Sequence, residues 1–219
     1  MQITPLHGIR DLRLDLTEPR WPRDPEWWTL RSFVESSPTR WNGPALAALE
    51  ADLDAGTLRV APADYFDLVA TTQRAAVSTP IVGALPRPSG VLCLVRDPGG
   101  VLLTRRSTQL DWAPGRYLAS AAEGFEPADA SVLDAARRVV EEIGLAPDQT
   151  GFTPFALGVS ATDVTTVVLY EHPTLIDLAA VRHWEFDDVR CAAPAVLLDA
   201  DLPLQHLSRW CLEHLTTPD

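Results

Sequence analysis

Charged side chains that could do chemistry are densest between Glu123 and Leu145. Arg138, Glu141 and Glu142 stand at positions i, i+3 and i+4, so a helix would place all three on one face. Carboxylates that converge in this way bind hard cations such as Mg²⁺ or Mn²⁺, which neutralise phosphate oxygens and activate water. The two glutamates are also compatible with an ordinary solvated helix end, and the spacing alone leaves both interpretations open.

The stretch 130–147 must form a helix for this arrangement to exist. Ser131 with Asp134 provides a start signal, and Gly144 followed by Pro147 provides a stop signal. Apolar residues recur at three- and four-residue spacing and predict one buried face. These residues are Val132, Leu133, Ala136, Val139, Val140 and Ile143.

The elements around this helix follow from apolar runs separated by turn residues. A β-hairpin is predicted over 90–107 around Asp97–Gly100, and a strand followed by an irregular loop over 115–129. Further strands are predicted at 153–159, 164–171 and 189–191, and helices at 175–181 and 203–215. Ahead of these, the sequence predicts a hairpin over 45–61 around Asp54–Gly56, a helix over 63–71 and an irregular connection over 79–90.

The segment from Glu123 to Leu145 resembles the Nudix box, usually written G-x5-E-x7-R-E-U-x-E-E-x-G-U with U apolar. Its spacing fits without a gap. The positions that match or conserve the charge are Asp129, Arg137, Val139, Glu141, Glu142, Gly144 and Leu145. The flanking hairpin and loop are also similar to those that surround the box in Nudix proteins.

The resemblance implies an α/β fold, a Nudix α/β/α sandwich with a mixed central sheet, formed by residues 87–219. Residues 1–86 would form an N-terminal extension that contains a β-hairpin and packs on the core. This extension resembles the one found in the UDP-sugar pyrophosphatase branch, which tends to carry an Asn-Gly pair, a hairpin and a Tyr-Asp helix. Asn42–Gly43, the 45–61 hairpin and Tyr65 with Asp67 fill these places.

The resemblance further implies a hydrolase that uses Mg²⁺ or Mn²⁺ to cleave a nucleoside diphosphate linked to another group, such as a sugar. The implied metal ligands are Glu123, Glu141 and Glu142, and the implied catalytic carboxylates are Glu141, Glu142 and Glu185. Asp129, Arg137 and Gly144 would hold the box in shape. Arginines that could present guanidinium groups to phosphates, or equally be surface charges, are Arg105, Arg106, Arg116 and Arg138.

Three positions depart from the box. Asp129 replaces a glutamate, Glu123 replaces the glycine, and Arg138 replaces a glutamate. The triad of Arg138 with the two glutamates carries a charge of −1 instead of −3, and a cation ~4 Å away would oppose Mg²⁺ by roughly 4 kcal/mol at an effective dielectric near 20. Arginine also cannot act as a general base.

Two hypotheses follow from these departures. In the first, the protein is a metal-dependent hydrolase in which Glu123 or Glu185 replaces the missing carboxylate. In the second, it has a Nudix fold without the usual hydrolysis, as a ligand-binding or regulatory module or a repurposed biosynthetic enzyme. Arg138 would then pair with Glu141 or Glu142, or would grip a phosphate directly.

Composition limits the other possibilities. The 219 residues carry a formal net charge of −12, which disfavours non-specific binding to nucleic acid or to an anionic membrane. The sequence has no lysine, which excludes Schiff-base chemistry and suggests a GC-rich genome of actinobacterial type. The three cysteines form no CxxC pair, which leaves a zinc ribbon unsupported.

The sequence shows neither a signal peptide nor a run long enough to span a membrane, so we expect a cytoplasmic protein. The expected partner is a small phosphate-containing substrate, with no nucleic acid or membrane. A homodimer through the extension or the last helix is compatible with the sequence.

Overall fold

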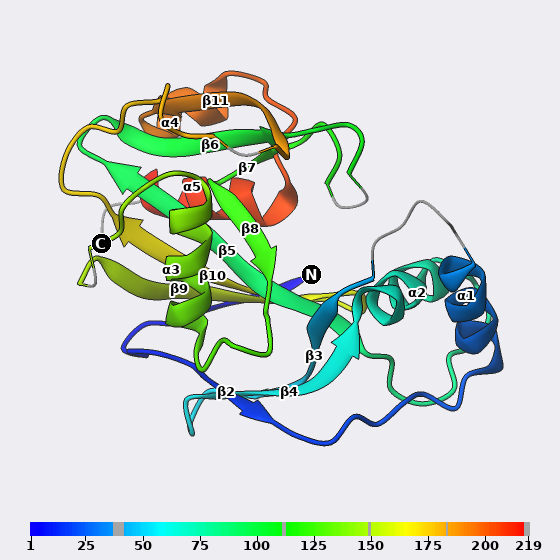
Figure 1. The fold of residues 1–219 in the computed structure, drawn as a ribbon. Coiled ribbons are helices and arrows are strands. Elements are labelled where there is room, and N and C mark those ends of the chain that lie inside the picture. Colours follow the sequence, from blue (N-terminus) through cyan, green and yellow to red (C-terminus); the bar gives the residue numbers. More distant parts are fainter. Residues whose placement is uncertain (37–41, 111–112, 149, 183, 217–219) are drawn as a thin grey trace.

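A mixed β-sheet runs through the whole molecule (Figure 1). The structure is a computed structural model and describes residues 1–36, 42–110, 113–148, 150–182 and 184–216. The strand order is β1-β9-β10-β5-β3-β4-β2, with β6 and β8 also pairing with β5, and with β7 and β11 pairing with β6. Strand β10 is parallel to β5, whereas the other neighbours of β5 are antiparallel to it.

The strands are β1 (Gln2–Pro5), β2 (Arg13–Leu16), β3 (Pro44–Asp52), β4 (Thr57–Asp64), β5 (Arg87–Asp97), β6 (Gly100–Arg106), β7 (Tyr117–Leu118), β8 (Ala121–Gly124), β9 (Phe152–Val159), β10 (Val164–Glu171) and β11 (Phe186–Ala192). The helices are α1 (Pro25–Glu35), α2 (Tyr65–Ala75), α3 (Val132–Glu142), α4 (Pro194–Asp199) and α5 (His206–Thr216). None of these helices is both long enough and apolar enough to cross a membrane.

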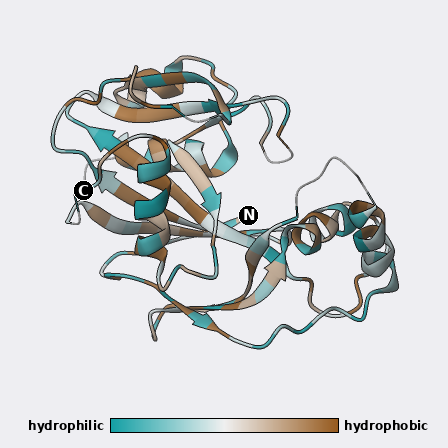
Figure 2. Ribbon diagram, viewed as in Figure 1, coloured by the Kyte–Doolittle hydropathy of each residue, from teal (hydrophilic) through white to brown (hydrophobic). Residues whose placement is uncertain are grey.

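Strand β5 divides the molecule into two packed layers. Its side chains Val91, Cys93 and Val95 belong to the core under α3, because successive strand residues point to opposite faces. Leu92 and Leu94 belong to the core under α4 and α5. Helix α3 lies on one side of the sheet and α5 on the other (Figure 1), and the strands between them are strongly hydrophobic (Figure 2). The predicted α/β/α sandwich with a mixed sheet is confirmed.

Both predicted hairpins, β3–β4 and β5–β6, are present, and each is stabilised by residues of its own turn. At the β5–β6 turn, the Asp97 carboxylate accepts hydrogen bonds from the N–H groups of Gly99 (2.7 Å) and Gly100 (3.0 Å). The β3–β4 turn places Gly56 at φ +62°, a conformation that costs glycine little. Helix α2 begins with a reciprocal capping box between Asp64 and Asp67.

The N-terminal extension is joined to the rest of the molecule through a common core. Helices α1 and α2 lie side by side at one end (Figure 1). A buried ion pair between Arg74 and Asp24 (2.9 Å) links them, and the Arg74 guanidinium holds the pKa of Asp24 well below its usual range. Leu12, Leu46 and Leu58 are buried in the same core as α3. The boundary near residue 86 therefore remains a prediction.

The helix predicted over 175–181 is wrong. Backbone N–H groups in this region donate to other parts of the chain: Ile176 to the Asp97 carboxylate (2.7 Å) and Arg182 to the carbonyl of Ile143 (3.1 Å). Ala180 closes a turn on Asp177. The segment 175–182, called the strap below, is thus a series of turns held to its neighbours, and these donors are not available for a helical ladder.

Several elements differ from the prediction or were not predicted. Strand β5 begins at Arg87, inside the stretch expected to be irregular, and the single strand expected after residue 115 is split into β7 and β8. Elements α1, α4, β1 and β2 were not predicted. Strand β1 pairs with β9, far away in the sequence, so its short local pattern carries little signal.

Candidate active site

Helix α3 carries the box residues and is fixed by its own sequence. The hydroxyl of Ser131 caps it by accepting from the N–H of Asp134 (3.3 Å). Val132, Val139 and Val140 are buried against the sheet, so the opposite face of α3 is left for charged groups. Gly144 ends the helix at φ +88°, as a glycine does after a helix C-terminus.

The N-terminal segment 11–14, which includes the start of β2, holds the start of α3. The N–H of Val132 donates to the carbonyl of Leu12 (2.9 Å), and the N–H of Leu14 donates to the carbonyl of Ala130 (3.0 Å). The Asp11 carboxylate accepts from the N–H of Leu133 (3.3 Å). The first turn of α3 and the loop before it are therefore positioned by a part of the chain outside the box.

Arg138 is a residue of α3 whose guanidinium reaches the loop that precedes the helix. Its guanidinium forms ion pairs with Asp129 (3.1 Å), Glu126 (3.3 Å) and Glu142 (3.3 Å). It also donates a hydrogen bond to the carbonyl of Gly124 (2.9 Å). A single guanidinium thus gathers three carboxylates and one carbonyl from β8, the loop and the helix.

The surroundings of Arg138 favour its charged form. Partial burial lowers the pKa of the guanidinium, but the hydrogen bond to Asp129 and the charges of Asp129, Glu126 and Glu142 raise it above its usual value. The side chain of Asp129 is 6% exposed, whereas those of Glu142 and Glu126 are 38% and 51% exposed. The pair with Asp129 is therefore the structural one, and the other two face solvent.

A second charged cluster lies on the same face of the sheet. The side chain of Arg106, at the end of β6, is 7% exposed and pairs with Glu185 (2.6 Å). Burial raises the pKa of Glu123 to about 7, and the negative charges of Glu185 and Glu142 add to this rise. Arg106 and Arg138 offset only part of it. Five of the residues predicted for the site thus interact here: Glu123, Glu142, Glu185, Arg106 and Arg138.

Other predicted residues are placed differently. Glu141 is exposed and makes no ion pair with another described residue. Arg137 pairs with Asp134 (2.8 Å) and lies over the ring of Phe152, so it is Arg138 that holds the loop residue Asp129. Gly144 lies close to the strap, since a Cβ there would be 2.7 Å from the carbonyl oxygen of Ala180.

Arg105 and Arg116 do not join the site. Arg105 directly precedes Arg106 on β6, so its side chain points to the opposite face of the sheet. It pairs with Asp187 (2.7 Å) beside Tyr117 of the α5-side core. Arg116 is exposed and donates to the carbonyl of Leu204 (3.5 Å). Of the four arginines predicted to bind phosphate, only Arg106 and Arg138 lie on the α3 face.

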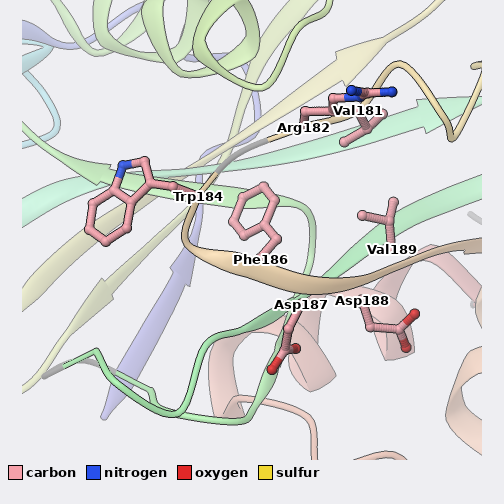
Figure 3. A pocket seen from close by; sticks show the side chains of 7 residues that line it. All are labelled: Val181, Arg182, Trp184, Phe186, Asp187, Asp188 and Val189. Carbon is pink, nitrogen blue, oxygen red and sulfur yellow. The ribbon is translucent and has the colours of Figure 1, made fainter.

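An open depression of about 660 Å³ lies along β11 and the segment that precedes it. Its lining residues come from the strap and β11: Val181, Arg182, Trp184, Phe186, Asp187, Asp188 and Val189. In Figure 3, Phe186 and Val189 project from one side of β11, whereas Asp187 and Asp188 project from the other. Phe186 and Val189 also pack against the core under α3, so the depression runs along the edge strand β11 and is lined from both of its sides.

A divalent metal ion does not fit this arrangement. Within the part of the chain that the structure describes, no group of three or more His, Cys, Asp or Glu side chains is placed to share an ion. The oxygens that the loop offers, those of Gly124 and Asp129, are hydrogen-bonded to the guanidinium of Arg138. A cation already fills their centre, so the set implied for Mg²⁺ or Mn²⁺ is not assembled.

Two partners of Arg138 were not predicted from the sequence. Glu126 and the carbonyl of Gly124 reach the guanidinium only because β8 and the loop fold over α3. The box pattern treats these positions as variable, so the sequence carried no signal for them. The depression beside Trp184 was also missed, because it depends on the turns of the strap.

The profile of the NUDIX domain family matches residues 86–211. The chain therefore belongs to the Nudix family. No curated protein matches it at the sequence level.

Solved structures are similar to this chain at low sequence identity. A Deinococcus radiodurans protein is 15% identical, with a TM-score of 0.50, over 64% of this chain and 90% of its own. The NUDIX domain of Shewanella oneidensis NrtR, complexed with ADP-ribose, is 15% identical, with a TM-score of 0.47, over 58% and 84%. A Francisella tularensis NMN adenylyltransferase/ADP-ribose pyrophosphatase, complexed with AMP and a manganese ion, is 12% identical, with a TM-score of 0.48, over 68% and 45%.

Proposed function

We propose that this Nudix-family protein binds a small molecule with a phosphate or diphosphate group on its α3 face without metal-assisted hydrolysis. The observation that carries the proposal is the guanidinium of Arg138 inside the box loop, held by Asp129, Glu126, Glu142 and the carbonyl of Gly124. The positive charge of Arg138 offsets part of the negative charge of the loop, as a bound divalent ion would otherwise do.

The charges around Arg138 determine how an anion would bind. Three carboxylates and one guanidinium leave a surplus of two negative charges, so a phosphate would bind only where some of these pairs open. The exposed pairs with Glu126 and Glu142 are of the kind worth only about 0–1 kcal/mol each. Phosphate oxygens would replace these two glutamates on the guanidinium, for which paired oxygens are a good match, while Asp129 stays.

Protonation of Glu123 would favour binding of the same phosphate-bearing ligand under mildly acidic conditions. Because the pKa of Glu123 is raised to about 7, this side chain is protonated below that pH and donates a hydrogen bond instead of repelling a phosphate. Arg106 would lie nearby as a second cation, although it is shared with Glu185. We therefore expect affinity for anions to increase as the pH falls through 7.

The finer identity of the ligand is also a proposal. A nucleoside diphosphate linked to a sugar is the class that the extension supports, since the β3–β4 hairpin and α2 follow the order seen in the UDP-sugar pyrophosphatase branch. We propose a cytoplasmic location on the basis of composition alone. The ADP-ribose and AMP bound to two of the structural neighbours are ligands of those proteins.

Binding and turnover can be separated in one set of measurements. Calorimetric titration with ADP and with inorganic pyrophosphate, in buffer containing EDTA, should show binding to the unaltered protein and weaker binding to Arg138→Gln. Incubation of the same protein with nucleotide-sugars, dinucleotides and nucleoside triphosphates in Mn²⁺ should release no nucleoside monophosphate. Metal-dependent release of a monophosphate would overturn the proposal.

Metal-dependent hydrolysis is a second candidate, favoured by one observation. Burial raises the pKa of Glu123, and the charges of Glu185 and Glu142 add to this rise. A divalent cation would relieve the repulsion among these carboxylates. Under this alternative, turnover would require Mg²⁺ or Mn²⁺ and would be lost in Glu142→Gln. Arg138 would then serve only to hold the loop.

A further inference from the structure

A second depression lies between the N-terminal extension and the first residues of β5, beside the neighbouring strands β3 and β4 (Figure 1). Its volume of about 670 Å³ falls within the size range of small-molecule pockets. Thr17 and Arg20 line it from the segment after β2, Arg59 from β4 and Arg87 from β5, and we call it the extension hollow. Its lining residues lie outside the box, and none of them is among the described partners of Arg138.

Two of the three arginines in the extension hollow have unused donors. Arg20 is exposed and makes no ion pair with another described residue. Arg87 donates to the carbonyl of Leu49 (2.8 Å) and has no carboxylate partner in the described part of the chain. Arg59 pairs with Glu50 (3.0 Å), but the two side chains are 44% and 65% exposed, so this pair is weak and can open. Guanidinium groups with unused donors are a good match for the two oxygens of a carboxylate.

The balance of charge favours a ligand with one negative charge. The carboxylates among the lining residues are Glu18 and Glu50. With three arginines beside them, one positive charge is left in surplus, in a chain whose formal net charge is −12. Apolar side chains complete the wall: Pro19, Ala48, Leu49, Ala84, Leu85 and Ala161. A small acid with one carboxylate and an apolar body fits both features, whereas a polyphosphate would bring further charges against apolar side chains and glutamates.

An unsatisfied hydroxyl group in the wall points to the same kind of ligand. The N–H of Thr17 donates to the carbonyl of Val60 (2.8 Å), which places Thr17 beside Arg59 on β4. The Thr17 hydroxyl is shielded from solvent and has no hydrogen-bond partner among the described residues. Shielded polar groups without a partner are rare and cost free energy. A carboxylate oxygen in the hollow would accept a hydrogen bond from this hydroxyl and remove that cost.

We propose that the extension hollow binds a small organic acid with a single carboxylate. The carboxylate accepts hydrogen bonds from Arg20, Arg87 and the Thr17 hydroxyl, and the apolar body of the acid packs on Leu49 and Leu85. This second site does not depend on the proposed function, because none of its residues takes part in phosphate binding on the α3 face.

Calorimetric titration tests the inference with four probes: 3-methylbutanoate, its uncharged amide 3-methylbutanamide, acetate and butanedioate. The first should bind most tightly. The amide should bind at least tenfold more weakly because it lacks the charge, and acetate because it lacks most of the apolar body. Butanedioate, whose second carboxylate would meet apolar side chains, should also bind at least tenfold more weakly. Equal affinity for 3-methylbutanoate and its amide, or for 3-methylbutanoate and butanedioate, overturns the inference.

Variants of the polar residues locate the binding. Arg20→Gln and Arg87→Gln should each weaken binding of 3-methylbutanoate about tenfold, the scale of a lost hydrogen bond to a charged group. Arg20→Gln removes an exposed side chain without an ion pair, so it tests the site even if Arg87→Gln fails to fold. Thr17→Val should weaken binding about fivefold without lowering the melting temperature, because the free protein loses no hydrogen bond. A lower melting temperature with unchanged affinity would contradict the role given to Thr17.

Arg13→Gln is the matched control, because Arg13 is exposed on β2 and does not line the hollow. It should bind 3-methylbutanoate as the unaltered protein does. Unchanged affinity in both Arg20→Gln and Arg87→Gln overturns the inference. An affinity that is lost in Arg138→Gln but kept in these two variants also overturns it, since the acid would then lie on the α3 face.

Discussion

Arg138 changes what the box loop can hold. A hard divalent ion requires oxygen ligands around an unoccupied centre, whereas the oxygens of Gly124, Asp129 and Glu142 surround a guanidinium that is covalently part of the protein. Arginine keeps its charge at any ordinary pH, and its planar donors match carboxylates well. Part of the negative charge of the loop is thus offset permanently by the chain itself, without dependence on metal concentration.

Replacement of this cation should destabilise the protein. Arg138→Gln leaves the Asp129 carboxylate, which is 6% exposed, without its charged partner. The free energy of unfolding should fall by about 1–3 kcal/mol at pH 7, as for a lost charge-assisted hydrogen bond at a buried acceptor. Urea titration monitored by circular dichroism measures this change.

Arg105→Gln is the control for this experiment, because Arg105 pairs with Asp187 where both side chains are 41% exposed. Its loss of stability should be clearly smaller. Equal losses in the two variants would show that Arg138 is an ordinary surface charge.

Glu123 provides a pH-dependent contribution to stability. A glutamate titrates near 4.5 in its reference state, and this one titrates near 7 in the folded protein. Between these values the folded protein holds a proton that the unfolded chain does not. Stability contributed by this group is therefore complete below pH 4.5, is lost as the pH rises through 7, and stays lost above it.

Glu123→Gln should remove this dependence. At pH 8.5 the variant should be more stable than the unaltered protein by about 1–3 kcal/mol, and the gap should close towards pH 5. Chemical denaturation at a series of pH values measures the gap. A difference that stays constant from pH 5 to 8.5 would contradict the assigned titration.

At the scale of elements, helix α3 is held at both ends by segments outside the box. The segment 11–14 fixes its first turn, and the strap fixes its last turn through the hydrogen bond from Arg182 to Ile143. Because the strap also carries Val181 and Arg182 into the depression, the geometry of the binding face depends on this junction.

Gly144→Ala should disturb the junction. The residue has φ +88°, and an added Cβ would lie 2.7 Å from the carbonyl oxygen of Ala180. The left-handed conformation costs a non-glycine residue about 1–2 kcal/mol, and displacement of the strap adds to this loss. Thermal unfolding measures the effect.

Gly8→Ala is the control that separates backbone strain from the clash with the strap. Gly8 also has a positive φ (+80°), but nothing lies within 4 Å of an added Cβ. It should lose only the conformational part. If both variants lose the same stability, the strap is not packed against the end of α3.

The sequence predicted the elements whose signals are local. The two hairpins and α3 carry their own turn and capping residues, such as Asp97 and Ser131, and the structure has them where they were expected. Elements that depend on distant partners were missed, as β1 shows by pairing with β9. The strap was predicted as a helix because its apolar spacing says nothing about the Asp97 carboxylate that binds its backbone.

The site was predicted in part for the same reason. The sequence located Arg138 and its conflict with the carboxylates, since the spacing on a helix is fixed. It could not place Glu126 or the Gly124 carbonyl, which reach the guanidinium through the fold of the loop. It also could not separate Arg105 from Arg106, whose side chains lie on opposite faces of the sheet.

At the scale of the whole molecule, the extension and the Nudix region share one core. Leu12, Leu46 and Leu58 are fully or almost fully buried together with residues of α3. The extension also contributes the segment that holds the first turn of α3. The binding face is therefore a product of the complete chain.

A truncated chain that begins at residue 87 should fail to fold cooperatively. It would expose the apolar surface of α3 and β5 that the extension covers, and several kcal/mol are lost when a few large side chains are uncovered, at about 1.5–3 kcal/mol each. Circular dichroism and thermal unfolding of this fragment test the prediction. A sharp transition near that of the full chain would show that residues 87–219 form an independent domain.

The most direct test of the central claim is calorimetric titration of the purified full chain with Mn²⁺ and Mg²⁺, beside Arg138→Glu. If Arg138 serves as the cation of the loop, the unaltered protein should show no metal binding at millimolar concentrations, and the variant, which regains a carboxylate and loses the competing charge, should bind. Binding of either ion by the unaltered protein at millimolar strength or better would contradict the account and return the protein to the metal-dependent hydrolases.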